Sequence, residues 1–258
     1  MLIDDEEIRR TAAWLLAGSR TETRDLRLDQ DVAYRIQDEA FCQRLERGER
    51  AAGIAARILS ATDGEPTFVT SWLTDAMLDL DVLRQPPGPQ VEVQVSAELG
   101  FVIGQQITDP LPSGAAALAA VDRVHGALHV RYHDAAQDDP AHSAATNGAT
   151  ACVSLGAVSA AVAGLDLQLE ACIVEVNGML AHAGTGAALL GHDPARALAA
   201  TLNSFVTRGH TIEPGWVVLA GSLAAPVPAG PGTVVSARFT RLGAVGLRIP
   251  GRAGSGAR

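Results

Sequence analysis

The chain begins with helical spacing and later changes to strand alternation. Between positions 4 and 17 apolar residues recur every three to four positions, and Asp29 is placed to cap a second helix that ends near 47–53. A third helix is indicated between Asp193, its N-cap, and Gly209, its stop. Alternation of apolar and polar residues predicts strands at 91–103, 165–176, 179–183, 216–220, 233–239 and 244–249.

Breaks in composition divide the chain into three parts. The stretch RQPPGP separates a region at 1–89, helical and then rich in turns, from a strand-rich region at 90–249. We interpret 1–89 as a helical and cavity-covering region and 90–249 as a β-rich core of catalytic type. The tail at 250–258 has no apolar face and is expected to be disordered. The fold class predicted from these parts is α+β.

Charge and composition narrow the class of partner. The 258 residues include 20 basic and 29 acidic ones, a net charge of −9, which disfavours nucleic acid and anionic membranes as partners. The three cysteines show no metal-ligand or disulfide spacing. The N-terminus lacks an apolar signal region, and no stretch reaches the roughly 20 apolar residues of a membrane span. We therefore expect a cytoplasmic protein that acts on a small molecule.

The strand at 91–103 carries the first candidate chemistry. Its odd positions are apolar, whereas Ser96 and Glu98 lie two apart on the other face, roughly 6.6 Å along the strand. A pair of carboxylates at this spacing could hold a divalent cation, but only one carboxylate is present.

The last third of the chain, from LAHAGTGAALLGHDP to GAVGLRI, resembles the 2-keto-4-pentenoate hydratase and 4-oxalocrotonate decarboxylase family of the fumarylacetoacetate-hydrolase-like superfamily. Five earlier segments resemble the same family: DVAYRIQ, RGERAAG, EPTF, AELGFVIG and SAATNGA. The resemblance implies a mixed β-sheet or barrel fold with an N-terminal helical region, and a homo-oligomer. It also implies Mg²⁺ or Mn²⁺ and chemistry on an enolisable 2-oxo acid.

The residues that carry this chemistry in the family are largely replaced. The resemblance implies three glutamate ligands, two in a Glu-x-Glu strand and one in a segment like ALEIVDSR, at positions that we align with Ser96, Glu98 and Ala119. A hard cation needs several oxygen ligands, so we expect no tightly bound metal. The family's lysine falls on Ala55 and its aspartate on Thr67.

Other residues are candidates for the same site. Glu98, with a raised pKa, is a candidate general acid or base, and His142 is a second because histidine titrates near neutral pH. The amides and hydroxyl of the turn at Gly221 and Ser222 could hold an oxyanion. The catalytic candidates are thus Glu98, His142 and Ser222, and the substrate-binding candidates are Ala55, Arg57, Thr67, Ser96, Ala119, Thr146, Asn147 and Gly221. Each also has a structural interpretation, for example a solvated loop histidine at 142.

Three functions remain open from the sequence. The first is a divergent, metal-independent lyase or cyclase that dehydrates, isomerises or closes a ring in a bulky carbonyl compound of a biosynthetic pathway. The second is a catalytically silent subunit, as a partner of an active paralogue, or a small-molecule-binding paralogue. The third is an ordinary Mg²⁺-dependent 2-oxo acid hydratase or decarboxylase, which would require a different alignment of the ligand positions. An open pocket near Glu98 would favour the first over an assembly subunit with a filled cavity.

Overall fold

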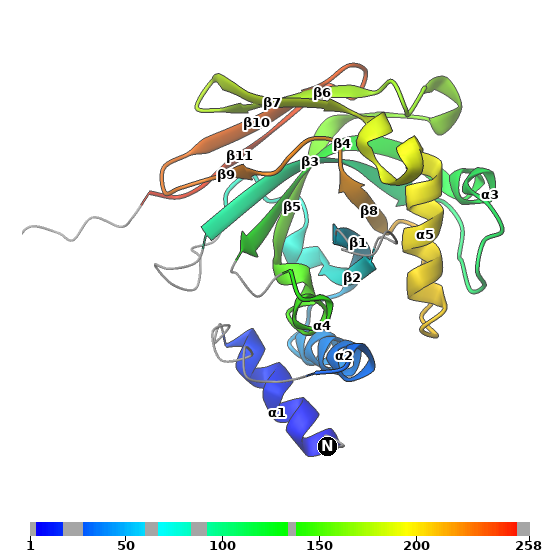
Figure 1. The fold of residues 1–258 in the computed structure, drawn as a ribbon, viewed down its shortest axis with the longest axis vertical. Coiled ribbons are helices and arrows are strands. Elements are labelled where there is room, and N and C mark those ends of the chain that lie inside the picture. The colour runs from blue at the N-terminus through cyan, green and yellow to red at the C-terminus, as the bar shows by residue number, and fades with distance from the viewer. Residues whose placement is uncertain (1–3, 18–27, 60–66, 84–91, 134–137, 252–258) are drawn as a thin grey trace, which may run out of the picture.

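The computed structural model describes residues 4–17, 28–59, 67–83, 92–133 and 138–251 (Figure 1). The α-helices are α1 (Asp5–Leu16), α2 (Gln30–Glu46), α3 (Gly114–Ala119), α4 (Pro140–Ala145) and α5 (Pro194–Val206). The strands are β1 (Ala51–Leu59), β2 (Thr67–Thr74), β3 (Glu92–Ile103), β4 (Val121–His133), β5 (Thr150–Ala160), β6 (Ala171–Val176), β7 (Met179–Thr185), β8 (Val217–Ser222), β9 (Val227–Pro228), β10 (Val234–Phe239) and β11 (Ala244–Arg248). No described helix is both long and apolar enough to cross a membrane.

The strands form two sheets. The larger sheet, sheet A, has the order β2-β1-β8-β3-β4-β5, with β9 beside β3, and is antiparallel except where β1 runs parallel to β8. The smaller sheet, sheet B, has the order β11-β10-β6-β7 and lies across β4 and β5 (Figure 1). α5 lies against β8, while α2 packs on α4 and α1 packs on α2 at the far end of the molecule. This is the mixed α+β architecture predicted from the sequence.

β3 separates two buried layers. Its odd-numbered residues, including Val95, Leu99 and Phe101, belong to the main hydrophobic core. Its even-numbered residues lie on the opposite face, which we call the inner face of sheet A. The apolar end of that face is a second core cluster of small and medium side chains: Ala55, Leu73, Met77, Ala127, Val153, Val217 and Leu219. The other end of the inner face is polar and carries the candidate site.

Most predicted elements are confirmed. The helices capped by Asp29 and Asp193 are present, and each aspartate accepts a hydrogen bond from a backbone N–H of the first turn. Asn177 and Gly178 form the predicted hairpin turn with φ of 52° and 78°. The strand predicted at 165–176 was too long, because Asp166 accepts hydrogen bonds from the amides of Gln168 and Leu169 and turns the chain before β6.

Two regions of the sequence-based division need comment. The first region is not all helical, since β1 and β2 belong to sheet A together with β3 and β8. The turn signals at 60–66 and 84–89 lie outside the described residues, as do 252–258 of the tail that was expected to be disordered.

Candidate functional site

Glu98 lies at the centre of the polar end of the inner face. Its carboxylate is completely buried, and its Oε1 atom lies within hydrogen-bond distance of several donors. Ser96 Oγ donates to Oε1 at 2.8 Å, and His129 Nδ1 and Arg131 Nη2 each lie 3.2 Å from it. Ser222 Oγ approaches the same oxygen at 3.5 Å. Oε2, by contrast, receives no hydrogen bond from any described residue.

Strand register explains why these residues meet. In the antiparallel pair β3–β4, Ser96 stands opposite His129 and Glu98 opposite Ala127. Directly opposed residues share a face, so His129 and Arg131 project onto the same inner face as Ser96 and Glu98. In β8, Ser222 stands opposite Glu98 from the other side. The site is therefore built from three adjacent strands.

The Arg131 guanidinium is held at three points. Besides Glu98, it donates from Nη1 to Ser96 Oγ at 3.3 Å and from Nη2 to the carbonyl oxygen of Ala56 in β1 at 3.2 Å. The Arg131 side chain is 12% exposed, against 0% for Glu98. One edge of this cation thus reaches a solvent-accessible pocket while its other edge faces the buried carboxylate.

The protonation states of the cluster follow from these contacts. Burial alone would raise the pKa of Glu98, but the charge of Arg131 and the hydrogen bonds from His129 and Ser96 outweigh it and lower the pKa to about 2. Burial and the nearby charge of Arg131 lower the pKa of His129 to about 4, against the opposing effect of Glu98. At neutral pH Glu98 is therefore ionised and His129 neutral. The expectation of a raised Glu98 pKa was wrong, because the sequence did not show the arginine beside it.

His129 acts as a fixed link between Glu98 and β5. An ionised carboxylate only accepts hydrogen bonds, so Nδ1 of His129 carries the proton. Nε2 then accepts from the Thr150 hydroxyl at 3.1 Å. Both ring nitrogens are used and the ring is fully buried, which leaves His129 a positioning group for Glu98.

A pocket of about 380 Å³ opens beside this cluster. Arg57, Arg131, Gly221 and Ser222 line it, together with residues of β4 and of the segment at 188–190. Arg57 also pairs with Asp138 at 3.3 Å, at the exposed rim. Two arginines from different strands therefore face one cavity in a chain whose net charge is −9, and this arrangement suits a ligand with an anionic or strongly polarised oxygen.

The structure brings many of the predicted site residues together. Arg57, Gly221 and Ser222 line the pocket. Ser96 and Glu98 do not line it, but both are buried and contact Arg131, which does. Ala55 belongs to the adjoining apolar cluster. Arg131 and His129 were not among the candidates that the sequence indicated, although both contact Glu98.

Ala119 is not at this site. It is exposed at the end of α3, and the next residue, Ala120, accepts a backbone hydrogen bond from Gly104. Gly104 directly follows β3 and lies six residues, or roughly 20 Å of extended chain, from Glu98. The family segment ALEIVDSR aligns better with Ala127-Leu128-His129-Val130, which places its glutamate position on His129. From the sequence alone, AALAAV and ALHV could both be aligned with the family segment. The pairing of β4 with β3 decides between them, because it places His129 beside Glu98.

The remaining predicted site residues lie outside the pocket. Asn147 accepts from the Trp72 amide at 2.7 Å and donates to its carbonyl at 2.9 Å, so it holds β2 in place. The Thr146 hydroxyl donates to the His142 carbonyl at 2.8 Å within the α4 turn, and α4 packs on α2. Thr67 begins β2 opposite Leu59. Neither these three residues nor His142 lines the pocket.

The polar side chains of the inner face differ from the ligands that the divalent metal implied by the resemblance would need. Glu98 supplies one carboxylate, Ser96 a neutral hydroxyl, and His129 an imidazole whose nitrogens are both engaged. Among the described residues no group of three or more His, Cys, Asp or Glu side chains is arranged to hold a metal ion. The Arg131 guanidinium against Glu98 adds a positive charge. These residues do not fit Mg²⁺ or Mn²⁺, which require several anionic oxygens.

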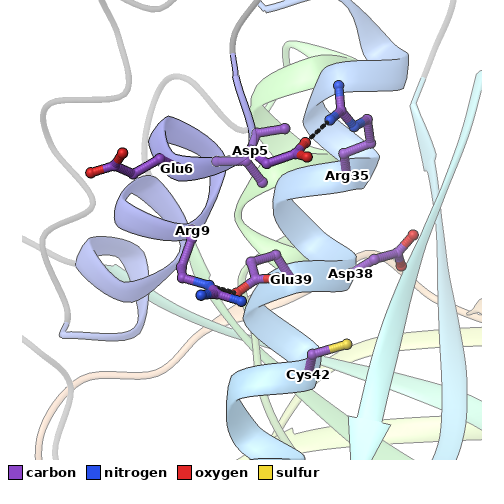
Figure 2. Close-up of a pocket in the computed structure, with 8 residues that line it drawn as sticks. Asp5, Glu6, Arg9, Arg35, Asp38, Glu39 and Cys42 are labelled. Carbon is purple, nitrogen blue, oxygen red and sulfur yellow. Dashed lines mark hydrogen bonds and ion pairs between the residues drawn. The ribbon is translucent and has the colours of Figure 1, made fainter.

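A larger hollow of about 600 Å³ lies between α1 and α2 (Figure 2). Figure 2 shows Arg35 against Asp5 and Arg9 against Glu39, pairs of 2.6 Å and 3.4 Å. Asp38 points away from α1 and accepts from Trp72 Nε1 at 2.8 Å. Both arginines that line the hollow thus pair with carboxylates, and among the described residues the hollow shows no set of convergent catalytic groups.

Comparisons with known proteins agree with this fold. No family model matches the chain. It is 29% identical over 224 residues to a 4-oxalocrotonate decarboxylase of Pseudomonas sp. (strain CF600), covering 84% of each chain. It is 27% identical over 231 residues to a 2-keto-4-pentenoate hydratase of Paraburkholderia xenovorans (strain LB400), covering 84% of this chain and 83% of the relative.

Two solved structures establish the fold. A 4-oxalocrotonate decarboxylase from Pseudomonas putida G7, complexed with magnesium and adipate, superposes with a TM-score of 0.85 at 24% identity, covering 96% of this chain and 99% of that one. A fumarylacetoacetate hydrolase from Exiguobacterium antarcticum gives a TM-score of 0.61 at 20% identity, covering 79% and 76%. The chain is therefore a homologue of the 4-oxalocrotonate decarboxylases and 2-keto-4-pentenoate hydratases, with the fold of the fumarylacetoacetate-hydrolase-like superfamily.

Proposed function

We propose that the chain is a lyase- or cyclase-type enzyme that acts without a divalent metal on a bulky, carbonyl-containing small molecule in a biosynthetic pathway. One observation carries this proposal. An open pocket of about 380 Å³ lies beside a guanidinium–carboxylate pair, at the strand where the resemblance implies metal ligands. The names of the relatives, a decarboxylase and hydratases, support a small organic substrate.

The charges of the site favour electrostatic stabilisation over proton transfer by Glu98. An ionised carboxylate with a pKa of about 2 holds no proton to donate at neutral pH, and it is a weak base. Arg131 and Ser222, in contrast, present N–H and O–H donors to the pocket. A carbonyl oxygen placed against them would be stabilised as negative charge develops on it. Glu98 then serves to hold Arg131 in place.

The reactions that suit such a site share one requirement. Michael-type ring closure, isomerisation and dehydration of a β-hydroxy carbonyl compound all develop charge on a carbonyl oxygen, and a cycloaddition gains from a polarised carbonyl. Enclosure in a pocket adds proximity, which lowers the entropic part of the barrier for ring closure. We therefore place oxyanion stabilisation by Arg131 and Ser222 at the centre of the mechanism, with shape selection by the pocket walls.

A second candidate is a catalytically silent subunit or small-molecule-binding paralogue. The same pocket would serve a binding protein, so the two functions differ only in turnover. An ordinary Mg²⁺-dependent hydratase is opposed by the donor set. Assembly as a homo-oligomer, or as an oligomer that includes a paralogous subunit, and a cytoplasmic location belong to the proposal as well.

The test is a turnover screen in the presence of EDTA. A panel of unsaturated 2-oxo acids and β-dicarbonyl compounds is incubated with the protein and followed by ultraviolet absorbance and mass spectrometry. We expect a product of unchanged mass, or one that has lost a water, and we expect Arg131→Met to abolish its formation while Arg123→Met does not. A product that forms only with added Mg²⁺ would contradict the proposal, and tight binding without turnover would favour the silent paralogue.

One member of the panel addresses the ordinary hydratase directly. We expect no hydration of 2-hydroxypenta-2,4-dienoate even with added Mg²⁺, since Ala55 and Thr67 stand at the positions of the family's lysine and aspartate. Loss of the dienoate absorbance at an ordinary enzymatic rate of roughly 1 to 10³ per second would restore the hydratase assignment.

A further inference from the structure

The disagreement between the inner-face residues and a divalent metal raises the question of what supplies positive charge at this place. With three glutamates, which the resemblance implies, the site would carry a formal charge of −3. Here Glu98 contributes −1 and the Arg131 guanidinium beside it contributes +1, so this pair has no net charge. A site with no net negative charge has little affinity for a divalent cation, and a guanidinium 3.2 Å from Glu98 Oε1 repels one.

The guanidinium of Arg131 is held by several protein oxygens, much as a bound metal ion would be held by its ligands. Three acceptors from two strands hold it: Glu98 Oε1 and Ser96 Oγ on β3, and the Ala56 carbonyl on β1. Its planar geometry makes it able to present further N–H groups to a ligand while these contacts persist. Because Arg131 also lines the pocket, a ligand oxygen can reach it directly.

The cluster is also incomplete as a purely structural ion pair. Glu98 Oε1 has donors within 3.5 Å from Ser96, His129, Arg131 and Ser222. Glu98 Oε2 is equally buried but receives no hydrogen bond from a described residue. An orphaned buried carboxylate oxygen costs desolvation energy, so this arrangement points to a further donor that arrives with a water or a ligand.

We propose that Arg131 is a built-in cation that takes the electrostatic place of the divalent metal, so that the pocket binds an anionic oxygen ligand directly on the guanidinium. Ser96 and Glu98 hold this cation and do not act as metal ligands. The inference rests on the proposed function because both use the same pocket. It concerns the binding of an anion, however, and can be tested whether or not the protein turns over a substrate.

The first experiment measures oxalate binding by isothermal titration calorimetry with EDTA present. Oxalate is a planar dianion that mimics an enolate. We expect wild-type protein to bind it, Arg131→Met to weaken binding by about 10-fold to 100-fold, the range for a lost charge-assisted hydrogen bond, and Arg123→Met to leave it unchanged. Arg123 is a matched control because it lies on the same strand in an exposed ion pair with Asp122 at 2.7 Å. Binding that requires a metal, or that survives Arg131→Met, would overturn the proposal.

The second experiment tests whether the metal site can be restored. Wild-type protein is expected not to bind Mn²⁺, measured by electron paramagnetic resonance and calorimetry. The triple variant Ser96→Glu/His129→Glu/Arg131→Met places three carboxylates on the inner face and removes the competing cation, and it should bind Mn²⁺ at one per chain. Near-stoichiometric Mn²⁺ on the wild type, or none on a folded triple variant, would refute the inference. If Arg131→Met does not fold, Arg131→Gln, which removes the charge but keeps hydrogen-bond donors, takes its place, and unchanged oxalate affinity in that variant would overturn the proposal.

Discussion

An ion pair in the hollow between α1 and α2 and the ion pair beside the inner-face pocket differ in their surroundings, and the difference determines what each pair does. Between α1 and α2, Arg35 and Asp5 approach to 2.6 Å with side chains 50% and 95% exposed. On the inner face, Arg131 and Glu98 are farther apart, at 3.2 Å, with side chains 12% and 0% exposed. The shorter pair is screened by water and contributes little, whereas the longer one is desolvated and fixes the charge state of its surroundings. Burial, and not distance, therefore distinguishes the candidate site from a surface ion pair.

Removing Arg131 should have the largest effect on stability. Arg131→Met leaves Glu98 ionised and unpaired in a buried position, and loss of one partner of a buried pair typically costs about 3–5 kcal/mol. We expect this loss in the free energy of unfolding from urea denaturation at pH 7. A loss below about 1 kcal/mol would mean that the pair is effectively solvated and would remove the contrast between the two hollows.

Removing the charge of Glu98 should cost less. Glu98→Gln leaves Arg131 without its anion, but the guanidinium keeps its edge toward the pocket, so we expect a loss of about 1–3 kcal/mol. The double variant Glu98→Gln/Arg131→Met should lose less than the sum of the single variants. Additive losses would show that the two residues do not act as a pair.

His129 should make the stability of the protein depend on pH. Its pKa falls from 6.5 to about 4 on folding, so the unfolded state binds a proton that the folded state does not. The free energy of unfolding should therefore decline as pH falls from 6.5 toward 4, by the slope of one proton. His129→Gln should remove that slope relative to the wild type, as measured by urea denaturation at several pH values. Equal slopes in both proteins would show that His129 titrates normally.

The smallest effect is expected in the other hollow. Arg35→Met removes a shorter ion pair, yet exposed pairs contribute about 0–1 kcal/mol, and the loss should shrink further as salt is added. The same urea denaturation used for Arg131→Met provides the direct comparison. A loss of several kcal/mol at 0.5 M salt, a concentration of about three times the physiological value, would be inconsistent with a screened surface pair.

The sequence was informative where a pattern is local. Period-two alternation placed Ser96 and Glu98 on one face of β3, and the structure confirms this, with the odd-numbered residues in the main core. The helix caps and the hairpin at Asn177 were also local signals. β1 was missed because its sequence, AAGIAARIL, has small residues on both faces and no alternation to detect.

The contacts that define the site were not local. Arg131 lies 35 residues from Ser96 and 75 from Ala56, so its role depends on the pairing of β3 with β4 and on the place of β1 in the sheet. The choice between Ala119 and His129 likewise depended on which segment pairs with Glu98, since both segments resemble the family's motif. A carboxylate's pKa could not be inferred either, because a strand pattern shows burial but not the partner across the sheet.

The three-point hold on the Arg131 guanidinium has a consequence for how such a site can evolve. A return to a site with several carboxylates requires changes at both Ser96 and Arg131. If Arg131 changes to a neutral residue first, the buried Glu98 carboxylate loses its cation. If Ser96 changes to glutamate first, a second carboxylate is buried without a cation of its own. In either order the single-substitution intermediate is less stable than the starting protein, so the effects of the two changes are strongly epistatic. Descendants of this chain are thus expected to acquire new substrates through the pocket walls while the guanidinium stays.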